Sequence, residues 1–260
     1  MGWLDALKKK PEVSVSGRMS SAYEAAARGD YEIALEIWTP LAHAGVARAQ
    51  TNIGACFFEG LGVDRDPKLA ERWLLLAAEA GDPAGRRNLA TLYFKGEGVD
   101  QDNVRAAALY RAAAEQGDAQ AQDMLSWMLL ESEEIAVDYA QARRWALAAA
   151  NQGVASSMTR LGMIFHNALG VDRDPAQAAL WWQRGAARGD ADGQAMLGAA
   201  YHLGAGVSRD PMTALVWLTR ALAGGSPLAG QFFNAVRAAL SPAELDEAER
   251  RAALPLEAVP

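Results

Sequence analysis

The chain has 260 residues, of which 51% are hydrophobic, so it has ample material for a buried core. Its 32 acidic and 25 basic residues give a net charge of -7, which works against a nucleic-acid partner, because binding to a phosphate backbone depends on clustered Lys and Arg. Cys56 is the single cysteine, which excludes an intramolecular disulfide. No uninterrupted run of about 18 apolar residues occurs, so we expect no integral membrane segment.

Residues 1–17 are interpreted as an N-terminal leader. Its few apolar residues precede three lysines, and this order is wrong for a secretory signal. Position 6 is Ala instead of the Ser or Thr that is typical of N-myristoylated proteins, which counts against N-myristoylation of Gly2. The arm from Trp3 to Lys10 either docks on a membrane or protein surface or is a loosely ordered leader. We therefore expect a cytoplasmic protein.

The turn Gly60-Leu61-Gly62-Val63-Asp64-Arg65-Asp66-Pro67 returns in near-copies along the chain at a spacing of 36 residues. Three columns at this spacing are unbroken: Asp30, Asp66, Asp102, Asp138, Asp174 and Asp210; Gly45, Gly81, Gly117, Gly153, Gly189 and Gly225; Ala34, Ala70, Ala106, Ala142, Ala178 and Ala214. Self-similarity at a fixed period of this length is the signature of a tandem-repeat protein.

The repeats predict an all-α solenoid of antiparallel helix pairs with a 36-residue repeat, in one continuous domain without β-sheet. Residues 18–46 form a variant first helix pair, 47–226 form five regular repeats, and 227–260 form capping helices and a tail. The first helix of the first regular repeat is expected over about 47–59, because Ile53 and Phe57 belong to a single apolar face.

Each repeat has the residues that its helix boundaries require. Asp66 is expected to cap the second helix, with Pro67 as the first helical residue. A column of small residues on the first helix predicts close approach to the second: Gly54, Ala90, Ser126, Gly162 and Gly198. A second column is expected in the core: Trp73, Leu109, Trp145, Trp181 and Trp217.

The third regular repeat departs from this pattern, because Ser132 and Glu134 stand where the other turns have glycine. A non-glycine residue in the left-handed conformation costs about 1 to 2 kcal/mol. Either the first helix of this repeat runs on, or the connection changes shape. Near the C-terminus, Ser241 and Pro242 are the expected N-cap and first residue of a final capping helix.

The pattern small-x-x-x-Leu-Gly-x-x-Tyr-x-x-Gly-x-Gly-Val-x-x-Asp-x-x-x-Ala, as in Ala155 to Ala178 or Gly193 to Ala214, resembles the Sel-one-like repeat family, a relative of the tetratricopeptide repeats. The resemblance covers about residues 20–240. It implies a right-handed superhelix of antiparallel helix pairs that serves as a protein-interaction scaffold. The third turn departs from the family pattern, and Cys56 alone cannot supply the disulfides of the secreted branch.

No constellation of residues indicates catalysis, a cofactor or a metal. Gly60-Leu61-Gly62 follows a helix rather than a strand, and Asp66 occupies the helix end that an anion would need. His166 and His202 are 36 residues apart but have no third Cys or His nearby for Zn²⁺. The alternative to a binding protein is a weak hydrolase or other enzyme that uses these histidines.

The candidate binding surface is the stripe of the first helices that faces away from the core, because these helices usually line the concave side of stacked pairs. We expect a monomer that binds a protein or peptide segment there, with apolar anchors and some basic character, centred on Trp127. The alternative is that its aromatic residues only pack between neighbouring helices. The groove candidates are Thr51, Phe58, Arg87, Thr91, Phe94, Asp123, Trp127, Leu130, Met163, His166 and His202.

Overall fold

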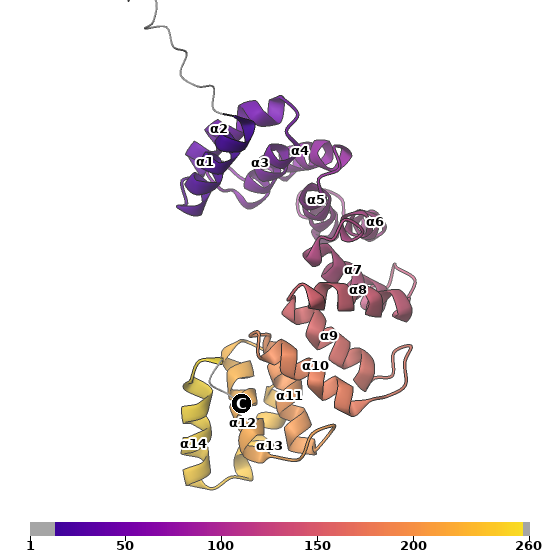
Figure 1. The fold of residues 1–260 in the computed structure, drawn as a ribbon, viewed down its shortest axis with the longest axis vertical. Coiled ribbons are helices and arrows are strands. Elements are labelled where there is room, and N and C mark those ends of the chain that lie inside the picture. The colour runs from indigo at the N-terminus through magenta and orange to yellow at the C-terminus, as the bar shows by residue number, and fades with distance from the viewer. Residues whose placement is uncertain (1–13, 257–260) are drawn as a thin grey trace, which may run out of the picture. The chain divides into compact units, whose positions relative to one another are not determined.

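The computed structural model describes residues 14–256, which contain α-helices and no β-strand (Figure 1). The all-α fold is confirmed, and the regular repeats are helix pairs with the expected period. The predicted arm from Trp3 to Lys10 lies outside the described residues. The helices are α1 (Val15–Ala27), α2 (Tyr31–His43), α3 (Ala47–Glu59), α4 (Pro67–Glu79), α5 (Pro83–Lys95), α6 (Asn103–Ala114), α7 (Ala119–Glu131), α8 (Tyr139–Asn151), α9 (Ala155–His166), α10 (Pro175–Ala186), α11 (Ala191–Leu203), α12 (Pro211–Ala223), α13 (Gly230–Ala238) and α14 (Pro242–Ala253).

The chain divides into two compact units between Asp118 and Ala119, where the sequence predicted one undivided array. The first unit contains α1 to α6 and the second contains α7 to α14. In a solenoid each repeat contacts mainly its neighbours, so no single core ties all repeats together. The first helix also begins earlier than expected, at Val15, because the Ser14 hydroxyl caps it by accepting from the Gly17 amide at 3.1 Å.

The aspartate column forms the predicted helix caps. Asp66 accepts from the Leu69 amide at 3.0 Å, and Pro67 is the first residue of α4. The other capping members are Asp102, Asp138, Asp174 and Asp210. Asp30 is the exception, because its carboxylate accepts from Arg28 Nε at 3.1 Å instead.

The small-residue column sits where the two helices of a repeat touch. A Cβ atom on Gly162 would lie 2.3 Å from Trp182 Cδ1, and one on Gly54 would lie 2.6 Å from Leu74 Cγ. The expected close approach is therefore confirmed. The predicted tryptophan column is confirmed in part, because Trp145 and Trp217 are buried, whereas Trp73 and Trp181 are only partly buried. The column one position later is buried throughout. The buried column is Leu74, Tyr110, Ala146, Trp182 and Leu218.

The third turn changes shape rather than extending its helix. Helix α7 ends at Glu131, the position equivalent to the end of α3 at Glu59. Among the described non-glycine residues only Ala168 has a positive φ, of 56°. This residue occupies the following turn, where Gly60 and its counterparts are left-handed. Ser132 is not left-handed, whereas Ala168 is and therefore bears the free-energy cost of this conformation.

The final helix caps the array as expected. The side chains and backbone of Ser241 and Glu244 form a capping box at the start of α14. Ala248 of this helix is fully buried in the cluster formed with α11, α12 and α13. Arg220 of α12 donates to the backbone oxygens of Arg251, at 3.1 Å, and Leu254. Within 14–256, no helix has the length and apolar character needed to cross a membrane.

Candidate functional site

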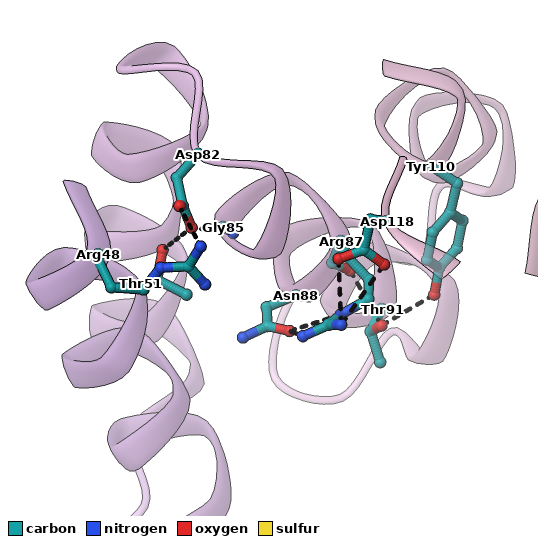
Figure 2. A network of polar contacts seen from close by, with 9 residues as sticks. All are labelled: Arg48, Thr51, Asp82, Gly85, Arg87, Asn88, Thr91, Tyr110 and Asp118. Carbon is teal, nitrogen blue, oxygen red and sulfur yellow. Dashed lines mark hydrogen bonds and ion pairs between the residues drawn. The ribbon is translucent and has the colours of Figure 1, made fainter. Parts of the chain in front are cut away.

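In the first unit, Thr51, the first residue of the predicted stripe, takes part in a polar contact between one repeat and the next. We call such a contact, in which a carboxylate links two successive repeats, a joint. Thr51 is buried, and its hydroxyl donates to the Asp82 carboxylate at 2.7 Å (Figure 2). The same carboxylate accepts from the Gly85 amide at 2.8 Å, which caps α5, and pairs with Arg48 at 3.1 Å. Thr51 is therefore a structural residue, and its assignment to an open groove is corrected.

The next stripe residues of this unit also have partners within the chain. Arg87 pairs with Asp118 at 3.2 Å, and the hydroxyl groups of Thr91 and Tyr110 are 2.9 Å apart (Figure 2). Asp118 stands one repeat after Asp82, so the two carboxylates form equivalent joints. The structure places Arg87 and Thr91 in half-buried contacts that link helices.

The two stripe phenylalanines of the first unit are covered to different degrees. Phe58 is buried, because Arg65 Cζ and Lys95 Nζ lie 5.5 and 5.1 Å from the centre of its ring. Its assignment to an exposed groove is therefore corrected in the same way as that of Thr51. Phe94 is half-buried, and its backbone oxygen accepts from Gln101 Nε2 at 2.9 Å.

In the second unit, the carboxylate of the first joint belongs to the first helix of the earlier repeat instead of capping the first helix of the next repeat. Val154 stands where Asp82 and Asp118 stand in the first unit, and the carboxylate comes from Asp123, a predicted groove residue that is in fact buried. Asp123 accepts from Ser156 at 3.0 Å, from Ser157, and from Arg160, with which it forms an ion pair. One repeat later the carboxylate is again the cap residue, since Thr159 donates to Asp190 at 2.6 Å.

These joints were missed by sequence reasoning, although the sequence contains a signal for them. The recurring glycine of the second helix is followed by aspartate in three repeats, at Asp82, Asp118 and Asp190. Such an aspartate is a natural N-cap for the next helix. Each of these carboxylates also accepts from a side chain of the preceding first helix, namely Thr51, Arg87 and Thr159.

Three predicted residues of the second unit do line a cavity. Trp127, Leu130 and Met163 border a groove of about 400 Å³ together with Tyr139 and other apolar side chains. We call this the Trp127 groove. Its remaining apolar lining is Leu169, Met196 and Leu228, and its acidic lining is Glu131, Asp190 and Asp192. The groove thus combines an apolar floor with carboxylates.

The indole and the phenol of this groove are held in defined positions. Trp127 Nε1 donates to Glu131 Oε2 at 3.1 Å, and the Trp127 ring is half-buried. Tyr139 is 40% exposed and lies against Gly170, where a Cβ atom would be 2.6 Å from the Tyr139 Cβ. The Trp127 indole is therefore held by a hydrogen bond, Tyr139 is in close contact with Gly170 at its Cβ, and both side chains are partly exposed.

The other repeats show that the fold does not require these aromatic residues. In the other regular repeats, the positions equivalent to Trp127 are Ala55, Thr91, Met163 and Ala199, and those equivalent to Tyr139 are Pro67, Asn103, Pro175 and Pro211. The variant first helix pair has Tyr31 at the latter position. The other regular repeats form the same helix pairs with smaller side chains. The aromatic pair is thus a local addition to the repeat.

The two histidines pack on aromatic rings and are not part of this lining. His166 lies 5.3 Å from the ring of Trp182, and burial, followed by the charge of Arg173, lowers its pKa. His202 lies 6.1 Å from the ring of Phe232. Among residues 14–256, no group of three or more His, Cys, Asp or Glu side chains is arranged to hold a metal.

The repeat model described as Sel1 repeat matches residues 47–82, 83–118, 119–154, 155–190 and 191–226. The helix pairs and this match define an α-solenoid of the tetratricopeptide-like class. The chain belongs to the Sel1 repeat family, whose members are generally protein-interaction scaffolds and typically non-enzymatic. A search among curated proteins gives no match.

Solved structures of bacterial proteins share the fold. A Sel1 repeat protein from Oxalobacter formigenes is 27% identical, with a TM-score of 0.81 over 94% of this chain and 99% of that one. A protective antigen present in uropathogenic Escherichia coli strains is 22% identical, with a TM-score of 0.59 over 92% of this chain and 60% of that one. An immunity protein from Pseudomonas aeruginosa is 16% identical, with a TM-score of 0.53 over 84% and 86%. The last two similarities concern the fold alone.

Proposed function

We propose that the protein is a non-enzymatic adaptor that binds a segment of a partner protein in the Trp127 groove. The observation that carries the proposal is the pair of partly open aromatic side chains, Trp127 and Tyr139, beside a cavity of about 400 Å³. The other regular repeats fold with smaller residues at both positions. Large aromatic side chains that a fold does not need are typical anchors of protein recognition.

The lining of the groove favours a particular kind of segment. Leu130, Met163 and Trp127 provide an apolar surface, which suits an apolar anchor side chain. Arg160 is the one basic residue among the described residues that line the groove, and it forms an ion pair with Asp123. Glu131 and Asp192, both exposed, leave the opening acidic, so a Lys or Arg beside the anchor is favoured.

Affinity capture from the source cell, followed by binding measurements with the captured partner, tests this proposal. Trp127→Ala should weaken binding by about 2 kcal/mol, or roughly 30-fold, because it removes the largest anchor surface. Leu203→Ala is the matched control, since Leu203 is 62% exposed in the same unit and does not line the groove. It should bind as the wild type does.

The urea midpoint of each variant separates loss of binding from loss of folding. Trp127→Ala should keep the free energy of unfolding within about 0.5 kcal/mol of the wild type, the range of an ordinary surface substitution. If wild type, Trp127→Ala and Leu203→Ala retrieve the same proteins with equal affinity, the groove does not bind the partner. If Trp127→Ala unfolds the second unit, Trp127 belongs to the core and the proposal fails.

A further inference from the structure

A second cavity of the second unit is lined by residues of α8, α9 and α10. It has a volume of about 520 Å³, and its lining includes Leu161 and Phe165 of α9. Successive helical residues are about 100° apart, so these two residues face away from Met163 in the Trp127 groove. We call this cavity the arginine cleft. Its further lining includes Arg143, Arg144, Leu147 and Trp181.

The arginine cleft is positively charged although the chain as a whole carries a charge of -7. None of the described residues that line it carries a carboxylate. Among residues 14–256, neither Arg143 nor Arg144 forms an ion pair, and Arg144 Cζ instead lies 4.9 Å from the centre of the Trp145 ring. Arg184 stacks in the same way over Trp181, at 4.5 Å. The Arg144 guanidinium is therefore positioned by an aromatic ring, and both Arg143 and Arg144 are exposed and available to an anion.

The internal repeats show that this charge is not needed for folding. The positions equivalent to Arg143 and Arg144 are Glu71 and Arg72, Ala107 and Ala108, Ala179 and Leu180, and Leu215 and Val216. All of these pairs lie in second helices that are nearly as long as α8 or equally long. At these two positions of the second helix, a pair of arginines occurs only in the third regular repeat, the repeat that also carries Trp127.

We infer that the arginine cleft is a second docking site, for a protein segment that places a carboxylate beside an apolar side chain. This inference is independent of the Trp127 groove and goes beyond the adaptor function proposed above. Guanidinium groups bind carboxylates through two parallel hydrogen bonds, and this geometry is available to exposed, unpaired arginines. Leu147, which is 42% exposed, and Trp181 supply the adjoining apolar surface.

Fluorescence anisotropy with synthetic peptides tests the inference on the full chain. The probe is a labelled, terminally blocked peptide in which leucines alternate with glutamates, and the matched probe has glutamine in place of every glutamate. The wild type should bind the glutamate peptide at least about tenfold more tightly than the glutamine peptide. Raising the salt from about 0.05 M to about 0.3 M should reduce this preference, because the site is exposed.

The variants assign the binding to one cavity. Arg143→Gln combined with Arg144→Gln should weaken binding of the glutamate peptide at least about tenfold. The charge-matched control combines Arg188→Gln with Arg237→Gln, both exposed in the same unit and outside the cleft, and should bind as the wild type does. Leu147→Ala should weaken both peptides, since it removes apolar surface only.

Three results would overturn the inference. The first is that the wild type does not bind the glutamate peptide at submillimolar concentrations or does not distinguish it from the glutamine peptide. The second is equal weakening by the two charge-matched double variants, which would mean a general charge effect. The third is loss of binding in Trp127→Ala but not in the cleft variant, which would place the peptide in the Trp127 groove.

Discussion

The two units use the same helix positions in different ways. The column that contains Thr51, Arg87, Asp123 and Thr159 joins repeats in both units through buried or half-buried carboxylates. The column one turn further along differs, because Thr91 bonds to Tyr110 in the first unit, whereas Trp127 opens onto a cavity in the second. The column that contains Thr51 therefore links successive repeats, and the column that contains Trp127 can vary without changing the fold. Function is expected where a column changes while the fold does not.

The largest expected effect compares two adjacent tryptophans, one in the fully buried column and one in the arginine cleft. Trp182→Ala should reduce the free energy of unfolding by about 3 to 5 kcal/mol, because it empties a fully packed site against Gly162. Trp181→Ala should cost much less, about 1 kcal/mol, because Trp181 is only partly buried. Urea unfolding of both variants measures the difference, and equal losses would mean that the two columns are not distinct.

A smaller effect is expected at the joints. Asp82→Ala removes a helix cap and also leaves the buried Thr51 hydroxyl without its acceptor, so the cost should be about 2 kcal/mol. Asp66→Ala removes only an exposed cap and should cost about 1 kcal/mol. Comparing the two urea midpoints isolates the contribution of the joint. A cost at Asp82 no larger than that at Asp66 would show that the joint adds no stability.

The two altered turns should respond in opposite ways to glycine. Ala168→Gly should stabilise the protein by up to about 1 kcal/mol, because it relieves a left-handed alanine. Ser132→Gly combined with Glu134→Gly should leave stability unchanged or slightly lower, because neither residue is left-handed and glycine adds freedom to the unfolded chain. Thermal unfolding of both variants makes the comparison. Destabilisation by Ala168→Gly would contradict the strain argument.

The smallest expected effect is the exchange of a variable residue between repeats. Trp127→Met places in the third repeat the residue that stands at the equivalent position of the fourth, Met163. The free energy of unfolding should change by no more than about 0.5 kcal/mol. A loss of several kcal/mol in urea unfolding would show that this column is as structural as the one before it.

The sequence predicted the helices well because equivalent positions of the repeats can be compared with one another within the one chain. Six aspartates recur at one spacing, and their interpretation as helix caps correctly placed the start of α4 at Pro67 and the starts of the equivalent helices. The exception, Asp30, shows the limit of the argument, because a nearby Arg28 takes its carboxylate. The column pattern could not show which of two neighbouring helical positions faces the core, so Trp181 was placed there instead of Trp182.

The binding surface was harder to predict from periodicity. A helical stripe gives an angle around the helix axis, but burial depends on what the next repeat places over it. Thr51 and Asp123 point along the expected stripe and are covered by the joints, whereas Trp127 is left open. The arginine cleft was not predicted, because its two arginines lie on a second helix, outside the stripe of the first helices that was expected to bind a partner.

Cys56 makes the opening of the first unit measurable by a chemical reaction. It lies buried in α3, and burial raises the pKa of its thiol from 9.0 to about 11. An alkylating reagent at neutral pH should therefore react mainly when this unit opens, so the labelling rate follows its opening and ignores the second unit. Because the folded pKa is raised, the contribution of this thiol to stability is complete below pH 9.0 and declines as the pH rises towards about 11. The sulfur atom of Cys56 thus reports the opening of the first unit alone, without any engineered probe.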